Sequence, residues 1–397
     1  MSVARSSLAA KSSPHARRLA LLIGAGVGSL IAGSLAAAWS LWYRTADFYC
    51  FWIGGRLVLA GRDPYDAPTW LAATAGVFPD PRGFLSPAPC ADRFAYPYWT
   101  AVVLAPFGAL PVEVAAMAWM SINVAAALAG ALVAWRIAGG TERGRALFLA
   151  LMLSSQPFWT LLVSGQFTGI MLGILASLAW ALARDEERSA GVALAALLVK
   201  PQFGVLVGPA VVAHAALARH VRLLTAMAIS AGVLAAVAFA LAPSWAGGWV
   251  AELQLRQAGQ LAVRPSVWGL SSFVFGDPAV GWLILAATIA LIVFLARGDA
   301  FAPVPLVALT ASLSLVISPY ESIYDHLVLV LPWALALAIA VRRESISLQI
   351  ALVAIASLLP WIVFAVWQRG GTATLGVLVP IAASLLLSFA LRLERTS

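Results

Sequence analysis

The sequence predicts an all-α protein, built as a polytopic transmembrane helix bundle of about 12 spans. Hydrophobic residues make up 62% of the 397 positions and charged residues only 11%, whereas a soluble domain carries about 25% charged residues. The long runs of Ala, Leu, Val and Ile show no period-2 alternation, which favours helices over a β-barrel. A chain of this composition needs lipid around most of its surface.

Twelve apolar segments are the candidate spans of this single domain, which we take to cover residues 1–397. The segments are 19–41, 113–136, 145–163, 167–184, 189–201, 203–218, 222–243, 279–296, 301–318, 324–341, 347–367 and 373–391. We interpret the first as a retained helix rather than a signal peptide, because it is longer than a typical apolar signal region. Lys200-Pro201-Gln202 separates two short segments, and proline there breaks or kinks a helix.

The distribution of charge orients these spans. With a cytoplasmic N-terminus and alternating sides, the inner segments hold 16 of the 25 Lys and Arg residues and 7 of the 17 acids. The inner net charge is then +9 and the outer net charge −1, in agreement with the positive-inside rule. The formal net charge of +8 is therefore explained by cytoplasmic loops and not by nucleic-acid binding. Both termini are expected in the cytoplasm.

This threading leaves two large extracytoplasmic loops, residues 42–112 and 243–278. The first contains an apolar stretch, 46–60, that is typical of an amphipathic helix on the membrane surface, and a half-helix at 98–110. It also contains the chain's two cysteines, Cys50 and Cys90. Two cysteines are too few for a zinc ribbon. Because both fall in the same outer loop, the sequence leaves a disulfide between them open, and the pairing cannot be read from sequence alone.

Asp47 is the first polar residue to which chemistry can be assigned. It lies six residues after the first span, at the boundary between lipid and water. A carboxylate there can accept a proton from a sugar hydroxyl as a general base. It can equally serve as the N-cap of a helix at 48–60, and position alone does not choose between these roles.

Lys200 is one of only two lysines and lies between two apolar half-helices. A cation near membrane depth is costly and usually faces a cavity or a partner, for which a phosphate is suitable; the alternative is a lysine that snorkels to the interface. His326 begins a helix that runs from the outer to the inner side, beside two acids and two tyrosines. A histidine there can donate to a phosphate or tune an acid; the alternative is a purely structural role.

Other outer-face polar residues have weaker individual signals. Tyr96 is either an aromatic wall for a ligand or an interfacial anchor, and Gln166 either binds hydroxyl groups or caps the helix that follows. Asp63 lies in a Gly- and Pro-containing turn, where turn chemistry is the better interpretation. Asp47, Gln166, Lys200 and His326 nevertheless fall on one face in the charge-derived threading.

Five segments, in the same order along the chain, give a resemblance to a known family. They are ADFYCFWIGGRLVLAGRDPYD, YPYWTAVVLAPFGALP, GQFTGIMLGILASLAWAL, AGVALAALLVKPQF and SPYESIYDHLVLVLP. Together they resemble glycosyltransferase family 87, the polyprenol-phosphate-mannose-dependent mannosyltransferases, whose fold is the GT-C bundle. The resemblance departs at two places: Tyr96-Pro97-Tyr98 stands where the family often has Tyr-Pro-Pro, and Arg264-Pro265-Ser266-Val267-Trp268 replaces an Asn-x-Ser stretch. The second region is expected to shape acceptor binding.

The resemblance implies a sugar, typically mannose, moved from a polyprenyl monophosphate to a lipid or glycan acceptor at the extracytoplasmic face, with inversion. It implies Asp47 as the catalytic base and Lys200 and His326 at the donor phosphate. The expected substrate-binding residues are Tyr96, Gln166, Gln202, Glu321, Tyr324 and Arg264. No metal or cofactor is expected, because cationic donors can assist a departing lipid phosphate.

Two other function classes compete with this one. A transporter or flippase of lipid-linked sugars would need polar residues at mid-membrane and often a repeat, and neither is evident in the sequence. A non-catalytic scaffold would leave Lys200 and Asp47 unexplained. The expected location is a bacterial inner membrane, as part of cell-envelope synthesis.

Overall fold

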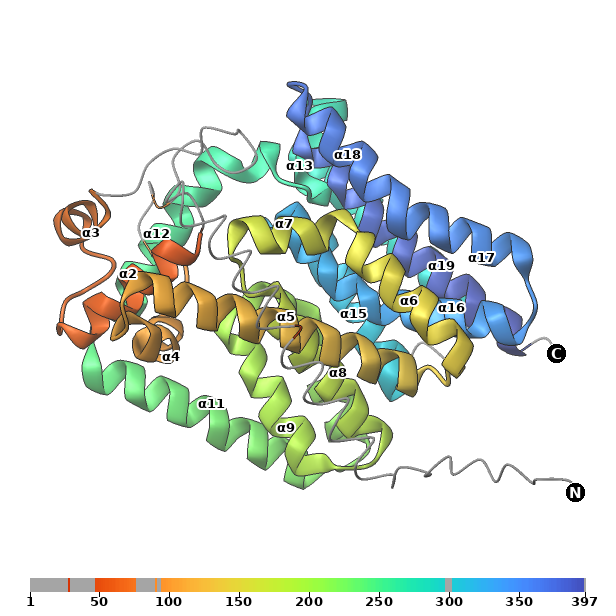
Figure 1. Cartoon of the computed structure of the whole chain (residues 1–397), viewed down its shortest axis with the longest axis horizontal. Coiled ribbons are helices and arrows are strands. Elements are labelled where there is room, and N and C mark those ends of the chain that lie inside the picture. The colour runs from red at the N-terminus through yellow and green to blue at the C-terminus, as the bar shows by residue number, and fades with distance from the viewer. Residues whose placement is uncertain (1–27, 29–46, 76–89, 91–93, 297–301, 396–397) are drawn as a thin grey trace, which may run out of the picture.

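The computed structural model describes residues 28, 47–75, 90, 94–296 and 302–395 of the chain (Figure 1). Every regular element among these residues is a helix, so the prediction of an all-helical chain is confirmed for this part. The predicted first span, 19–41, lies outside the described residues apart from Gly28.

Five helical stretches in the described part are long and apolar enough to cross a membrane. They are α5 (Val112–Ile137), α11 (Val221–Leu241), η6 with α16 (Ile323–Arg342), α17 with η7 and α18 (Ile346–Gln368), and η8 with α19 (Ala373–Arg395). Several other apolar helices are shorter, for example α8 (Thr168–Ala183) and α15 (Pro303–Ile317). A 16-residue helix is only about 24 Å long, less than the roughly 30 Å hydrocarbon core. By length and composition, the described residues therefore contain fewer spans than the sequence predicts.

The long helices divide into central and peripheral ones. The apolar window of η6–α16 is 94% buried, whereas the windows of α11 and α17–α18 are 11% and 17% buried. These two outer helices lie on opposite edges of the molecule (Figure 1). Their exposed Leu, Ile and Val side chains would form large apolar patches in water, so the periphery is suited to lipid. The protein is a membrane protein on this evidence.

One predicted span is bent. Residues 145–163 form two helices, α6 (Glu142–Ser154) and α7 (Gln156–Ser164), which meet at an angle of 52°. Ser155 between them has extended backbone angles, and Pro157 lies in the first turn of α7. Proline has no N–H to donate and is tolerated in a first turn but not in a helix interior, which explains why one helix does not run through.

The predicted break at Lys200-Pro201 is confirmed. α9 (Glu187–Ala196) continues as the 3₁₀ turn η1 (Leu197–Val199), and a second turn, η2 (Pro201–Phe203), leads into α10 (Gly204–Leu217). Lys200 has φ −134° and ψ 81°, because the residue before a proline is forced out of the helical region. The helix is therefore interrupted at Lys200, the residue whose side chain enters the site.

The two predicted loops are largely helical, and they pack on each other. The first contains α2 (Phe48–Leu59), α3 (Ala67–Thr74) and α4 (Tyr98–Gly108); the second contains α12 (Trp245–Gln260), η3 (Leu261–Val263), α13 (Val267–Phe275) and η4 (Pro278–Val280). Trp249 of α12 donates its indole N–H to the carbonyl of Ala95 at 3.1 Å, and Cys50 of α2 is disulfide-bonded to Cys90. Helices α2, α3, α4 and α12 therefore gather at one end of the molecule (left in Figure 1).

Candidate active site

Asp47 stands immediately before α2, but it does not cap that helix. Its backbone is already helical and its side chain makes no capping hydrogen bond. The carboxylate instead accepts a hydrogen bond from the Gln166 side chain, with Nε2 2.6 Å from Oδ2. The N-cap alternative is therefore wrong, and the carboxylate of Asp47 faces the interior of the helix assembly. In contrast, Asp63 stabilises the predicted turn by accepting a hydrogen bond from the backbone N–H of Tyr65. Asp66 caps α3 by accepting from the backbone N–H of Thr69.

Gln166 is placed by the sharp turn between α7 and α8. Gly165 ends α7 with a left-handed φ of +68°, a conformation that glycine adopts without the penalty of a Cβ. Trp119 of α5 holds this turn by donating to the Gly165 carbonyl at 2.7 Å. The buried Gln166 side chain then points into the molecule, where it does not cap α8.

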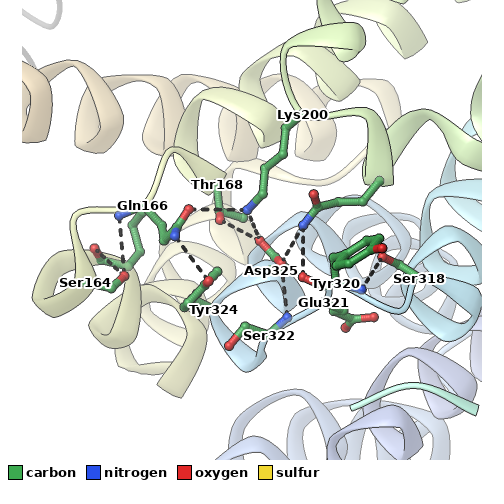
Figure 2. Close-up of polar contacts among 12 residues, drawn as sticks. Ser164, Gln166, Thr168, Lys200, Ser318, Tyr320, Glu321, Ser322, Tyr324 and Asp325 are labelled. Atoms are coloured by element: carbon green, nitrogen blue, oxygen red, sulfur yellow. Dashed lines mark hydrogen bonds and ion pairs between the residues drawn. The ribbon is translucent and has the colours of Figure 1, made fainter. Parts of the chain in front are cut away.

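Both ends of the Gln166 amide have partners. Nε2 donates to Asp47 and also to the hydroxyl of Tyr324 at 3.1 Å. Oε1 accepts from the ammonium group of Lys200 at 3.4 Å and from the hydroxyl of Tyr96 at 3.5 Å. Figure 2 shows the amide between Lys200 and Tyr324. One side chain thus joins four of the predicted site residues.

Lys200 is fully buried and forms an ion pair with Asp325. Its ammonium group lies 5.0–5.2 Å from the ring centres of Phe167, Phe203 and Tyr324, within the range of cation–π attraction. An unpaired buried charge is very costly. The ion pair and the rings explain how a cation is tolerated at this depth, and they exclude the snorkelling alternative for Lys200.

Asp325 is the most extensively hydrogen-bonded acid of the site. Besides Lys200, it accepts from the hydroxyl of Thr168 at 3.2 Å, the amide of Gln202 at 3.2 Å and the backbone N–H of Ser322 at 3.2 Å (Figure 2). The Ser322 bond belongs to a capping box at the start of η6 (Ile323–Leu329). Asp325 therefore ties α8, η2 and η6 together.

Glu321 and His326 form a second acid–base pair next to this cluster. Nε2 of His326 and Oε1 of Glu321 are 2.6 Å apart, but neither these atoms nor Oε2 of Glu321 have the geometry of a hydrogen bond to any described residue. Both side chains are buried. Burial, followed by the negative charge of Asp325, raises the pKa of Glu321 well above its ordinary value.

The electrostatics of Asp47 combine opposing effects. Burial raises its pKa; the Gln166 hydrogen bond and the positive charges of Lys200, Arg264 and Arg256 lower it, and the net result is a raised pKa. Arg264 follows η3, and Arg256 in α12 is paired with Glu252 at 2.8 Å. A carboxylate with a raised pKa is a stronger base than a free aspartate, which is what proton abstraction requires.

The structure thus brings together Asp47, Tyr96, Gln166, Lys200, Gln202 and Tyr324, with Glu321 and His326 adjacent and Arg264 bearing on the site by its charge. Sequence reasoning did not select Asp325, Thr168 or Arg256. Asp325 had a signal, since a buried lysine requires an acid and this one begins an apolar helix. Thr168 and Arg256 had none. No group of three or more His, Cys, Asp and Glu side chains among the described residues is placed to hold a metal ion.

Comparison with known proteins gives one match. The model of glycosyltransferase family 87 matches residues 94–319, more than half of the chain. The matched part contains Tyr96, Gln166, Lys200, Gln202 and Arg264, while Asp47 precedes it and Tyr324, Asp325 and His326 follow it. Searches of curated proteins and of solved structures found no match to the chain.

Proposed function

The chain belongs to glycosyltransferase family 87, and from that premise we propose that it moves mannose from a polyprenyl monophosphate to a lipid or glycan acceptor. The observation that carries the proposal is the position of Asp47. Its half-buried carboxylate is held by the Gln166 amide and borders a buried polar cluster in a chain that is otherwise apolar. Such a carboxylate is suited to accept a proton beside a lipid-borne substrate.

The proposed reaction is a single displacement. Asp47 takes the proton of the acceptor hydroxyl, the acceptor oxygen forms a bond to the anomeric carbon, and the bond from that carbon to the phosphate oxygen breaks. The electron pair of the broken bond leaves with the polyprenyl phosphate. Attack opposite to the leaving group inverts the anomeric centre, and one base is sufficient because no covalent sugar–enzyme intermediate is formed.

The phosphate side of this reaction needs positive charge or hydrogen-bond donors. We assign it to Arg264 and His326, because Pro265, the residue after Arg264, and the His326 ring both lie next to Gly376 of η8 (Ala373–Val377). A Cβ added at Gly376 would lie 2.7 Å from the Pro265 Cβ and 3.5 Å from the His326 Cε1. The turn that carries Arg264 and the His326 ring therefore flank the same glycine, and the charge of Arg264 also acts on Asp47.

The remaining parts of the proposal concern the membrane. We propose that the complete chain has 12 spans in a GT-C arrangement in the inner membrane, with both termini cytoplasmic and the loops 42–112 and 243–278 outside. Disulfides persist in oxidising compartments and are rare in the cytosol, so the Cys50–Cys90 bond supports an extracytoplasmic first loop. The packing of α12 on the first loop supports an acceptor site formed by both loops beside Asp47, Tyr96 and Tyr324.

The proposal is tested with the full chain in lipid nanodiscs. A panel of donors, polyprenyl phosphomannose, polyprenyl phosphoglucose and GDP-mannose, is supplied with short mannose-containing glycolipids, and the product is characterised by NMR of the new anomeric centre. The proposal expects transfer from polyprenyl phosphomannose alone, with inversion. Transfer from the nucleotide sugar, or retention of configuration, would contradict it, and ATP-independent movement of the intact donor across the bilayer without transfer would favour a flippase.

A further inference from the structure

The orientation of the Gln166 amide is fixed from both ends. Oε1 faces the ammonium group of Lys200, which can only donate, and Nε2 faces the carboxylate of Asp47, which can only accept when ionised. A flipped amide would place oxygen against the Asp47 carboxylate and N–H against the Lys200 ammonium. Both contacts would then be repulsive, so the network determines which way the amide lies.

The charge of Lys200 is already committed. Its ammonium group and Asp325 are both fully buried and form an ion pair, and Asp325 receives three further hydrogen bonds, from Thr168, Gln202 and Ser322. The pair is electrically neutral and is fixed to three segments of the chain. A neutral, immobile pair is poorly suited to follow the charge of a leaving phosphate, but it is well suited to hold a neighbouring dipole.

We propose that Lys200 and Asp325 are positioning residues, whose ion pair fixes the Gln166 amide so that its NH₂ group faces Asp47 and Tyr324. This rests on the proposed function in one respect, since it takes Asp47 as the base. Lys200 then positions Asp47 through Gln166 and does not touch the reacting atoms. The family resemblance implies instead that Lys200 binds the donor phosphate, and the proposal departs from it at this point. The amide holds the carboxylate in place and its donated hydrogen bond stabilises the ionised form.

The consequence is measurable at Asp47. Removing the ion pair frees the amide to rotate, the hydrogen bond to the carboxylate weakens, and the pKa of Asp47 rises further. A hydrogen bond to a charged group contributes about 1.5–3 kcal/mol, so we expect a shift on the order of one pH unit. The other charged or titratable groups that bear on Asp47 are Arg256, Arg264, Tyr96 and Tyr324, and none of them is substituted in the variants below.

The test uses K200M/D325N, which removes the ion pair without changing the net charge. The charge of Lys200 also lowers the pKa of Asp47 directly, so the same variant is compared in a Q166L background, where only that direct effect remains. Carbodiimide with an amine nucleophile labels protonated carboxyl groups, and mass spectrometry of the peptide containing residue 47 gives the labelling of Asp47 as a function of pH. Exposed Glu113 serves as the internal reference. E142Q/R145Q, which removes a solvent-exposed ion pair, is the matched control.

The labelling midpoint of Asp47 should move up by about one pH unit in K200M/D325N and stay unchanged in the control. Q166L should move the midpoint in the same direction, and K200M/D325N should add only the direct effect in the Q166L background, less than its shift in the wild type. An unmoved midpoint in K200M/D325N, or additive shifts, would overturn the proposal. K200M/D325L gives a second background if the first fails to fold, because apolar replacement of a buried ion pair is often neutral.

An activity measurement separates this inference from the proposed function. If wild-type protein transfers no sugar from polyprenyl phosphomannose, the proposed function fails while the labelling result at Asp47 still decides the positioning role. In active protein, K200M/D325N should keep the donor KM and move the acidic limb of kcat/KM to higher pH. A raised donor KM with an unmoved acidic limb would assign Lys200 to the phosphate and overturn the proposal.

Discussion

Gln166 and Asp47 are separated by 119 positions in the sequence, yet the Gln166 Nε2 lies 2.6 Å from the Asp47 Oδ2. The bond joins the turn between α7 and α8 to the start of α2, and so connects the first loop to the core of the bundle. Without it the carboxylate would have no fixed position relative to the polar cluster. The predictions below begin with this contact and move outward.

Replacing Gln166 by leucine should lower kcat/KM at neutral pH roughly tenfold, because a hydrogen bond to a charged group is lost. The sign of the pH effect follows from the same bond. The bond lowers the pKa of Asp47, so its loss raises that pKa and the acidic limb of the pH–rate profile moves to higher pH. Gln349→Leu in α17, where the amide donates to the carbonyl of Ala340 and to no described site residue, is the control. An acidic limb that stays in place would refute the contact's role.

Lys200→Ala should strongly destabilise the folded protein. The variant leaves Asp325 buried without its counter-charge, which costs about 3–5 kcal/mol. Arg145→Ala removes one member of the exposed pair with Glu142 and should change stability little. Thermal unfolding of both variants in the same detergent gives the comparison, and equal midpoints would show that the buried pair contributes no more than the surface one.

The Cys50–Cys90 disulfide provides a test of sidedness. After mild reduction of intact bacterial spheroplasts, a membrane-impermeant maleimide should label these cysteines. A cysteine introduced at Ser345, between α16 and α17, should stay unlabelled in a C50S/C90S background until the membrane is permeabilised. The opposite pattern would place the first loop in the cytoplasm and remove the topological basis of the site.

The same disulfide should stabilise the first loop. Closing a loop of 40 residues contributes about 4 kcal/mol in the chain-entropy model. The C50S/C90S variant should therefore unfold at a lower temperature than the wild type under oxidising conditions and at the same temperature under reducing ones. A difference that persists after reduction would mean that the serines, and not the missing bond, cause the loss.

Gly376→Ala tests the proposed binding of the donor phosphate by Arg264 and His326. The added methyl group would lie 2.7 Å from the Pro265 Cβ, so the turn that carries Arg264 must shift. We expect a several-fold increase in donor KM with the fold retained. Gly208→Ala, whose Cβ meets nothing within 4 Å, is the matched control, and equal donor KM values in the two variants would remove Arg264 and His326 from the donor site.

The sequence was informative where a polar residue interrupts an apolar run. The break at Lys200-Pro201 and the helices at 48–60 and 98–110 were predicted correctly, because proline, composition and charge act locally. The bend at Ser155 was missed, although Pro157 signalled it, since the apolar run continues across it. The number of spans did not follow from apolar runs, because helices such as α8 and α15 are apolar but shorter than a long membrane-crossing helix.

The site residues were predicted one at a time, and their partnerships were not. A buried lysine demands an acid, but several acids lie near helix starts, and only the fold selects Asp325 over Glu321. At Asp47 the local sequence allowed both an N-cap and a base, and a tertiary contact with Gln166 determines the position of the carboxylate. Hydrogen-bond geometry between distant segments depends on packing that no single stretch of sequence encodes.

The most direct test of the account is the initial rate of mannose transfer from polyprenyl phosphomannose by Asp47→Asn in nanodiscs, compared with wild type. Asp63→Asn, which changes an exposed turn acid of the same loop, is the control and should keep the wild-type rate. We predict that Asp47→Asn folds normally and loses a factor of about 10²–10⁴ in rate. A rate near that of the wild type would contradict the assignment of Asp47 as the base and, with it, the proposed active site.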